Sequence, residues 1–299
     1  MFLTTKQAAD KWGISERRVR KLCEDGKIAG AIRVGRNWNV PENAQQPVDG
    51  RLKTVSGLLD SIAAKRAELD GLRPLTQGEV KRLNEEFAVE YTYNSNAIEG
   101  NTLTLRETDL VLRGITIDKK PLKEHLEIIG HKEAFDYICE LVKEKAPLTE
   151  SVIKQIHSLV LADSPQDRGI YRRVPVRILG AKHTPPQPYV IDGMMSDLLA
   201  RYAADGSNII TALAELHIEF EGIHPFVDGN GRTGRLIVNL ELMKNGYPPI
   251  DIKYSDRLRY YDAFDAYYAE HDIAPMQRLF AEYVLERLNK YVSILKDMH

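Results

Sequence analysis

The stretch IHPFVDGNGRTGR, residues 223–235, crowds a histidine, an aspartate and two arginines around a glycine-rich turn. Apolar residues recur at helical spacing on both sides of this turn, which predicts two buried helices joined by it. Because the residue before a proline is disfavoured in helical backbone, Pro225 predicts that the first helix ends near His224. The apolar faces comprise Ile210, Leu213, Leu216, Phe220 and Ile223 before the turn, and Leu236, Ile237, Leu240 and Met243 after it.

The turn has the features of a phosphate site. The backbone amides of residues 229–231 are predicted to lie at a helix N-terminus, where unpaired N–H groups and the helix dipole attract anions. Arg232 and Arg235 are three residues apart and are predicted to face the same anion. Asp228 is a candidate Mg²⁺ ligand, and His224 is a candidate general base. Each residue taken singly also has an ordinary structural interpretation, and it is their combination that favours a site.

Composition indicates a globular protein. The 299 residues favour about two domains, and 43% of them are hydrophobic and 28% charged. No apolar run approaches the roughly 20 residues that cross a bilayer, and the N-terminus lacks a secretory signal pattern. Cys23 and Cys139 match no metal-binding spacing and are predicted to be reduced thiols. These features predict a cytoplasmic protein with no membrane association.

Charge is unevenly distributed along the chain. Residues 1–46 contain nine Lys or Arg and five Asp or Glu residues, so this segment carries about +4 although the whole chain carries −2. The asymmetry predicts a small basic module attached to a larger acidic one. Within the module the pattern predicts a helix from Thr5 to Trp12, a second helix from Ser15 to Gly26, and two short strands in Ile28–Val40.

This order of helix, helix and hairpin resembles the excisionase and MerR-type winged helix-turn-helix family. The resemblance implies DNA binding, with the second helix in the major groove and the hairpin as a wing. The basic residues that would contact DNA are Arg17, Arg18 and Lys21 on the helix and Arg33 and Arg36 on the wing. A protein-binding or vestigial module is the alternative.

The rest of the chain is predicted to be mainly α-helical. Residues 47–75 are predicted to form a linker and a connecting helix. Capping boxes and apolar spacing predict the later helices: one opened by Thr76 and Glu79 and ended near Gly100, one opened by Thr104 and Glu107, and others at 121–144, 149–162 and from 193 onward. Alternation and a Pro-Pro turn within residues 171–191 predict a β-hairpin.

The motif from His224 to Arg235 resembles the signature of the Fic family, H-P-F-x-[D/E]-G-N-G-R-x-x-R, with every specified position matched. The resemblance covers about residues 76–290 and includes GIYR at 169–172 and RLRYYDAFDAYY at 257–268. It implies a helical core with a small β-hairpin called the flap. The expected organisation is a winged helix-turn-helix module at 1–46, a linker with a connecting helix at 47–75, and a Fic domain at 76–299.

The resemblance implies an enzyme that transfers AMP from ATP to a Tyr, Thr or Ser hydroxyl of a target protein or of the chain itself, with release of pyrophosphate. It implies that His224 is the general base, that Asp228 holds Mg²⁺, and that Tyr261 lies near the adenine. The target peptide would pair with the flap, Val176–Pro186, by strand addition. Fic proteins commonly dimerise, so a homodimer is a further expectation.

The same resemblance distributes the phosphates of ATP over the turn. The implied contacts are the amides of Gly229, Asn230 and Gly231 for the phosphates, the Asn230 side chain for the α-phosphate, Arg232 for the β-phosphate and Arg235 for the γ-phosphate. Tyr268 stands where some relatives have an asparagine, which leaves the preferred base of the nucleotide open.

A second motif, SNAIEGN at residues 95–101, resembles the inhibitory motif of the family, [S/T]-x-x-x-E-[G/N], with Ser95 and Glu99 at its specified positions. A carboxylate at Glu99 can form a charge-assisted hydrogen bond to Arg235 and so occupy the group that would bind the γ-phosphate. An inhibitory helix is therefore expected at about residues 90–100. Two other functions stay open: removal of AMP from a modified protein with the help of Glu99, and a DNA-binding regulator whose Fic domain senses nucleotide.

Overall fold

A computed structural model describes residues 2–12, 15–35, 37–42, 44, 54–178 and 180–297. The chain divides into two compact units, Met1–Thr54 and Val55–His299. The predicted linker at Gln45–Gly50 and the helix break predicted at Gly13 lie outside the described residues. Each unit is therefore described by itself.

The first unit combines two helices with a small antiparallel sheet. Its elements are β1 (Phe2–Thr4), α1 (Thr5–Trp12), α2 (Glu16–Glu24), β2 (Ile32–Val34) and β3 (Asn37–Pro41). The strand order is β1-β3-β2, with Leu3 opposite Val40 and Arg33 opposite Trp38. A core of its own is formed by Ala8, Ala9, Val19, Leu22, Cys23, Ile28 and Val40. The first strand was not predicted, because three residues are too few to show alternation.

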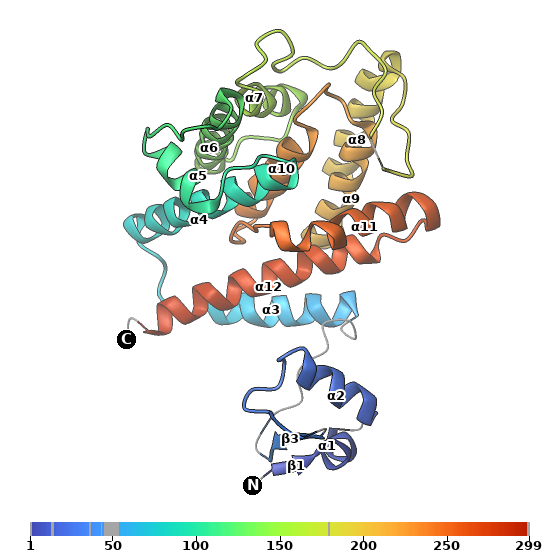
Figure 1. The fold of residues 1–299 in the computed structure, drawn as a ribbon. Helices are drawn as coiled ribbons and strands as arrows, with labels where there is room; N and C mark the ends of the chain where they lie inside the picture. The colour runs from blue at the N-terminus through green and yellow to red at the C-terminus, as the bar shows by residue number, and fades with distance from the viewer. Residues whose placement is uncertain are drawn as a thin grey trace. The chain divides into compact units, whose positions relative to one another are not determined.

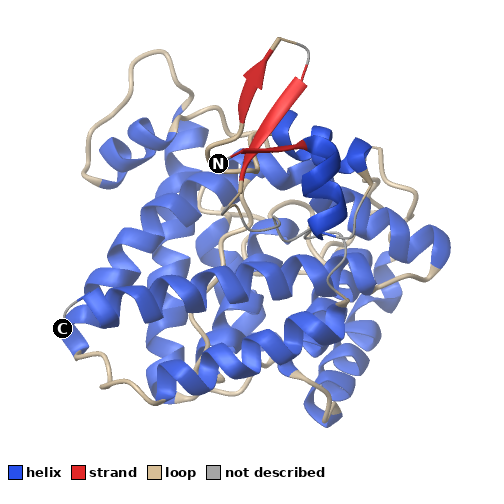
Figure 2. Ribbon diagram, turned by 90° about the horizontal axis from the view of Figure 1, so that it is seen from below, coloured by secondary structure: helices blue, strands red, loops and turns tan. Residues whose placement is uncertain are grey.

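The second unit is helical. Its elements are α3 (Val55–Asp70), α4 (Gln77–Ile98), α5 (Leu105–Leu112), α6 (Leu122–Glu144), α7 (Glu150–Val160), η1 (Pro188–Val190), α8 (Ile191–Ala204), α9 (Ile209–Ile223), α10 (Asn230–Lys244), η2 (Tyr254–Asp256), α11 (Arg257–Glu270) and α12 (Ala274–Asp297) (Figure 1). Strands among the described residues occur only in the first unit (Figure 2). No helix among the described residues combines the length and apolar character needed to cross a membrane.

The ends of α4 are fixed by local sequence. The Thr76 hydroxyl accepts a hydrogen bond from the Glu79 amide at 3.2 Å, and the Glu79 carboxylate accepts one from the Thr76 amide at 2.7 Å. This capping box satisfies two amides that have no partner inside the helix. At the other end Glu99 is the C-cap and Gly100 has φ +96°, the left-handed conformation that favours glycine. Both ends agree with the prediction, and they place Ser95 and Glu99 on the last turn of α4.

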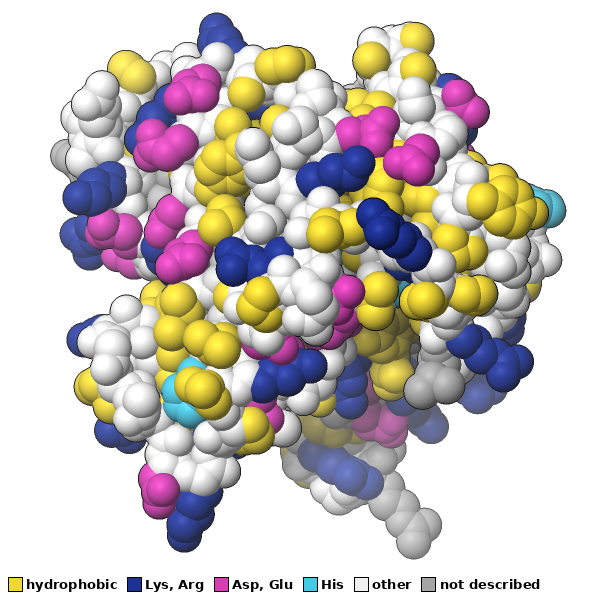
Figure 3. Space-filling view, turned by 90° about the horizontal axis from the view of Figure 1, so that it is seen from above, with side chains coloured by type: hydrophobic (Ala, Val, Ile, Leu, Met, Phe, Trp, Pro, Cys, Tyr) yellow, Lys and Arg dark blue, Asp and Glu magenta, His cyan; other side chains and the backbone are white. Residues whose placement is uncertain are grey.

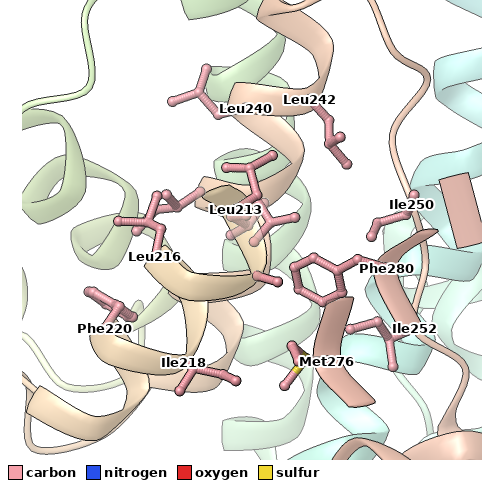
Figure 4. Packing of buried hydrophobic residues seen from close by; sticks show 14 of the residues in the cluster. Leu213, Leu216, Ile218, Phe220, Leu240, Leu242, Ile250, Ile252, Met276 and Phe280 are labelled. Carbon is pink, nitrogen blue, oxygen red and sulfur yellow. The ribbon is translucent and has the colours of Figure 1, made fainter. Parts of the chain in front are cut away.

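Helix α10 lies at the centre of the second unit. It is buried on all sides from Arg232 to Leu242, and it packs against α4, α6, α7 and α9. Its buried residues are apolar from Leu236 to Val238 and also include the polar Arg232, Arg235, Asn239 and Glu241. Leu213, Leu216 and Phe220 of α9 contribute to the same cluster as Phe280 of α12 (Figure 4). Because α10 is held on every side, its N-terminus is a rigid platform.

The predicted β-hairpin at residues 171–191 is not present. The described part of residues 171–187, which lacks only position 179, is a loop without paired strands, and residues 188–191 form η1 and the first residue of α8. The 171–191 segment contains four prolines, Pro175, Pro185, Pro186 and Pro188, and each proline removes an N–H donor from a ladder. An isolated two-stranded ribbon is also only marginally stable. The flap of this chain is therefore an irregular loop that side chains anchor at its ends.

Candidate active site

The glycine-rich turn is a closed loop between α9 and α10. His224 is the C-cap of α9 with φ +49° and ψ +60°, and Gly229, with φ +78°, precedes α10. The Asn230 side chain closes the loop, because its Oδ1 accepts from the Phe226 amide and its Nδ2 donates to the Phe226 carbonyl, both at 2.9 Å. Two of the four residues named here have left-handed backbone, so the turn is tightly constrained.

This loop presents an anion site. The first amides of a helix have no partner within it, and the helix dipole places positive charge there. Gly229, Asn230 and Gly231, which lie at the start of α10, line a cavity of about 460 Å³, a size typical of small-molecule sites. Because both amide atoms of the Asn230 side chain bond to Phe226, this residue offers the cavity its backbone N–H rather than its side chain.

The cavity walls come from four parts of the chain. They are the end of α9 with the turn and the start of α10, the end of α4, the loop around residue 181, and α11. On the face of the molecule shown in Figure 3, Lys and Arg side chains are interspersed with Asp and Glu side chains. We therefore expect an anion to be attracted by the residues that line the cavity, Gly229–Gly231 and Arg235, and not by a uniformly positive surface.

Glu99 already occupies this floor. Its Oε1 lies 2.8 Å from Nη2 of Arg235, whose side chain is only 3% exposed. A Cβ atom at Gly231 would lie 2.2 Å from the same oxygen, so the carboxylate fits against the start of α10 only because residue 231 is glycine. The structure thus places an anion of the chain itself where the dipole and Arg235 favour one.

Ser95 fixes the other side of Arg235. Its hydroxyl accepts from Nε at 3.0 Å, and its carbonyl accepts from Nη2 at 2.8 Å. Tyr260, which sequence analysis missed, lies with its hydroxyl 3.4 Å from Nη1. Arg235 is therefore oriented by α4 and α11 before any ligand binds.

Arg232 does not face the cavity. Its buried guanidinium lies 3.4 Å from each of three oxygens, on Asn96, Glu127 and Asp228. Residues three apart on a helix differ by about 60° around its axis, and Arg232 lies between Asn96 of α4 and Glu127 of α6, whereas Arg235 contacts Ser95 and Glu99 at the end of α4. Arg235 lines the cavity and Arg232 does not, so the structure does not bring both arginines to the cavity.

His224 has the protonation state of a general base. Its Nδ1 lies 3.3 Å from the Glu221 carbonyl, which can only accept, so Nδ1 carries the proton and Nε2 has a free lone pair. Burial lowers the pKa of His224 below its usual value, which favours the neutral ring at pH 7. The His224 carbonyl accepts from Nε of buried Arg172 at 2.8 Å. Arg172 belongs to the GIYR segment, whose role in holding the turn was not foreseen.

Asp228 lies at the mouth of the cavity. Its side chain is 53% exposed, and its Oδ2 lies 3.9 Å from Nζ of Lys123. The described residues contain no group of three or more His, Cys, Asp or Glu side chains that could hold a metal ion. Mg²⁺ commonly binds proteins through one or two carboxylates and completes its shell with phosphates and water. A single exposed Asp228 beside an anion site fits that mode.

Aromatic residues line part of the cavity. Tyr261, the expected adenine neighbour, is 44% exposed and donates to the Ile98 carbonyl at 3.0 Å. Tyr268 stacks on His183 of the flap loop, with ring centroids 4.0 Å apart. Its hydroxyl donates to the Ile218 carbonyl at 2.7 Å. This part therefore offers flat apolar surfaces to a base, while the Tyr268 hydroxyl is already used.

Glu221 is a second carboxyl group that sequence analysis missed. It lines the cavity one turn before His224, and its enclosed Oε1 has no hydrogen-bond partner. Burial, with a further contribution from Glu99, raises its pKa to about 8. Between pH 4.5 and 8 the folded protein thus binds the proton that the unfolded chain releases, so this group makes stability fall as pH rises.

We expect Glu221→Gln to remove that part of the pH dependence. Thermal unfolding followed from pH 5 to 9 should show a flatter decline for the variant and a higher melting temperature than wild type at pH 9. Glu85→Gln, at an exposed position on α4, is the matched control and should keep the wild-type slope. Parallel curves for Glu221→Gln and wild type would contradict the protonated state.

Comparison with known proteins agrees with this architecture. Residues 147–242 match the Fic/DOC family model. This stretch of the chain is therefore similar to Fic domains. The structure is similar to that of a Fic domain containing signaling protein from Bacteroides thetaiotaomicron, with a TM-score of 0.72 and 28% identity over 79% of this chain and 97% of that one. It is also similar to Fic-1 from C. elegans (aa134–508), with a TM-score of 0.72 and 29% identity over 82% of this chain and 74% of that one.

Curated relatives carry the name protein adenylyltransferase Fic. The relative from Drosophila willistoni is 34% identical over 245 residues, which are 80% of this chain and 48% of that protein. The relative from Nematostella vectensis is 34% identical over 243 residues, 79% of this chain and 56% of that protein. The chain thus spans about half the length of the curated relatives it matches.

Proposed function

We propose that the Fic domain transfers AMP from ATP to a hydroxyl group of a target protein or of the chain itself. The observation that carries this proposal is that neutral His224 and the amides at the start of α10 line one cavity. Adenylyl transfer needs both a base for the incoming hydroxyl and a site for the phosphates. The relatives named adenylyltransferase support the same reaction.

The reaction follows from these positions. His224 Nε2 removes the proton from a Ser, Thr or Tyr hydroxyl, whose oxygen forms a bond to the α-phosphorus. The bond from that phosphorus to the bridging oxygen breaks, and pyrophosphate leaves with the electron pair. Negative charge that develops on the phosphoryl oxygens meets the amides of Asn230 and Gly231, which need no reorganisation because the turn is already closed. The Gly229 amide already donates to Asp228 Oδ1 at 2.6 Å. Most of the catalysis is therefore electrostatic and positional.

Mg²⁺ has a supporting part in the proposal. Bound to Asp228, it would neutralise phosphate charge. Arg232 and Lys123 lie 3.4 and 3.9 Å from the two Asp228 oxygens, so they orient the carboxylate at the mouth. We assign Arg232 to that role, and Arg235 to the terminal phosphate once Glu99 has left it.

The flap loop is the proposed docking site for the target. It borders the cavity at Ile178, Gly180 and Ala181, and its described residues are not paired with another strand of the chain. Extended backbone with unpaired N–H and C=O groups can bind a peptide by strand addition. Such pairing would bring a hydroxyl of the target to His224 without requiring a hairpin beforehand.

We propose that Glu99 holds the enzyme in an inhibited state. ATP that binds while Arg235 is paired with Glu99 loses its ligand for the γ-phosphate, so the α-phosphate is not aligned with His224. The carboxylate also lies against Gly231, so it competes with phosphate for the helix N-terminus itself. Activation then requires Glu99 to move away.

Removal of AMP is a second candidate. Glu99 and His224 line the same cavity, so the carboxylate has the position to orient a water molecule toward a phosphodiester. Incubation with a protein that already carries AMP distinguishes the two activities. Loss of AMP that depends on Glu99 would favour removal, whereas retention would favour transfer.

The experiment that tests the proposed function is intact mass spectrometry. The purified protein, alone and with candidate targets, is incubated with ATP and Mg²⁺, and the Glu99→Gly variant is treated in parallel. A mass increase of one AMP on either polypeptide supports adenylyl transfer. Absence of any increase in both proteins would exclude it.

For the first unit we propose DNA binding. Arg17 is exposed on α2, and two helices precede the strands β2 and β3; Arg36 lies outside the described residues. We expect full-length protein to bind duplex DNA with an affinity that falls as salt rises. The double substitution of Arg17 and Arg18 with alanine should weaken this binding.

Fluorescence anisotropy at several salt concentrations measures the affinity. The double substitution of Lys81 and Arg82 with alanine, on α4, is the control. No binding at low salt would reject the proposal, and binding that responds to ATP would favour a nucleotide-sensing regulator.

A further inference from the structure

His157 is a buried histidine on α7, far in sequence from the glycine-rich turn. Its ring stacks on Phe226 with centroids 3.6 Å apart and an interplanar angle of 5°. Its Nδ1 accepts from the Gly169 amide at 2.9 Å, and its Nε2 lies 2.9 Å from the Asp228 carbonyl. Because a carbonyl can only accept, the ring must be the neutral tautomer with the proton on Nε2.

These contacts add to those that hold the turn from other sides. Asn230 fixes the backbone of Phe226, whereas His157 fixes the Phe226 ring and the Asp228 carbonyl. The ring also supports Gly229, where a Cβ atom would lie 3.4 Å from the His157 ring. His157 therefore contacts Asp228 and Gly229, the two residues immediately before α10.

Gly169 has a specific part in this arrangement. Its φ is +66°, and a Cβ atom there would lie 2.8 Å from the Lys154 carbonyl oxygen. Only glycine can bring its amide to the His157 ring in this conformation without displacing α7. The glycine of the GIYR segment thus determines which nitrogen of His157 faces the turn.

We infer that His157 is a positioning residue that fixes Asp228 and the start of α10 in the geometry that binds Mg²⁺-ATP. The inference rests on the proposed function. His157 does not line the cavity, so it acts through Asp228 and Gly229 rather than on the substrate. Outer partners that orient metal ligands typically contribute about 10–100-fold to metal affinity or activity.

The test uses the Glu99→Gly protein as the starting point. His157→Phe keeps an aromatic ring beside Phe226 but removes both hydrogen bonds, and it should raise the KM for ATP and the half-saturating Mg²⁺ concentration by about 10-fold or more. His157→Gln retains an N–H donor for the Asp228 carbonyl and should recover most of this loss. A structural defect alone would lower the folded fraction and kcat and leave both concentrations unchanged.

His125→Phe is the matched control. His125 is also buried, and it too accepts from a backbone amide, that of Ile117, and pairs with a backbone carbonyl, that of Pro121, each at 2.9 Å. It lies outside the cavity lining, so its replacement should leave the KM for ATP and the Mg²⁺ dependence unchanged. Equal KM values for His157→Phe and His125→Phe would overturn the inference.

ATP binding is measured directly so that the positioning role can be tested even if AMP transfer is absent. Calorimetric titration with ATP, with and without Mg²⁺, should show a larger loss of affinity for His157→Phe when Mg²⁺ is present. If Glu99→Gly transfers no AMP, the proposed function fails, and this titration still decides the positioning role. If His157→Phe does not fold, His157→Gln and Gly169→Ala are compared instead, and only Gly169→Ala should weaken Mg²⁺-dependent binding.

Discussion

Replacement of Glu99 with glycine is expected to raise the rate of AMP transfer by roughly 10- to 100-fold. The carboxylate now holds Arg235 through a charge-assisted bond at 2.8 Å, and such bonds contribute about 1.5–3 kcal/mol. ATP has to compete with that contact for both Arg235 and the start of α10. Once the carboxylate is removed, the γ-phosphate gains the arginine and the α-phosphate can face His224.

The substitution should leave the fold intact. Glu99 is the C-cap of α4 rather than an interior residue, and it is followed by Gly100 in left-handed backbone. Glycine is well tolerated at such a helix end. The vacated Arg235 still has the hydroxyl and carbonyl of Ser95, so its charge is not left without partners. Circular dichroism and the melting temperature should therefore change little.

The measurement is the rate of mass gain per chain in Mg²⁺-ATP. Glu86→Ala, which removes an exposed ion pair on the same helix, should behave like wild type. Arg235→Ala should show no gain in rate, because the inhibitory contact and the γ-phosphate ligand are lost together. Equal rates for wild type and Glu99→Gly would show that Glu99 does not inhibit.

The contact between Glu99 and Arg235 could be predicted because the positions of both residues depend on local signals. Thr76 and Glu79 fix where α4 begins, Gly100 fixes where it ends, and the glycine-rich turn fixes the start of α10. These effects act within a few residues, so they are visible in the sequence. The pairing of Glu99 with Arg235 then needs only that the two helices pack together, which the resemblance to Fic proteins supplied.

The parts that sequence analysis missed depend on distant residues. Arg232 contacts Asn96 on α4 and Glu127 on α6, each more than 100 positions earlier in the chain. His157 reaches the Asp228 carbonyl across 71 positions. The flap was predicted as a hairpin because its alternation is local, whereas its anchors are tertiary: Arg172 donates to the Pro186 carbonyl at 2.6 Å, and Tyr268 stacks on His183. Tertiary contacts overrode the local pattern of the flap, and they placed His157 where no local pattern points.

Replacement of His224 is expected to abolish AMP transfer while leaving ATP binding in place. General bases typically contribute 10²- to 10⁴-fold to a rate, and the proposed base acts on the hydroxyl rather than on the nucleotide. The phosphates would still meet the amides at the start of α10. The Glu99→Gly protein is the starting point, so that the loss is measured against an active enzyme.

The choice of variant matters because His224 has φ +49°. Alanine is strained in this left-handed region, whereas asparagine adopts it readily, so His224→Asn is the matched partner of His224→Ala. Both should lose transfer, and His224→Asn should also keep the melting temperature and the calorimetric affinity for ATP. Because burial lowers the pKa of His224, transfer by the unmutated base should persist at neutral pH and fall only as the pH drops below about 6.5. Normal transfer by His224→Asn would remove His224 from the chemical step and leave the amides of the turn as the source of the catalysis.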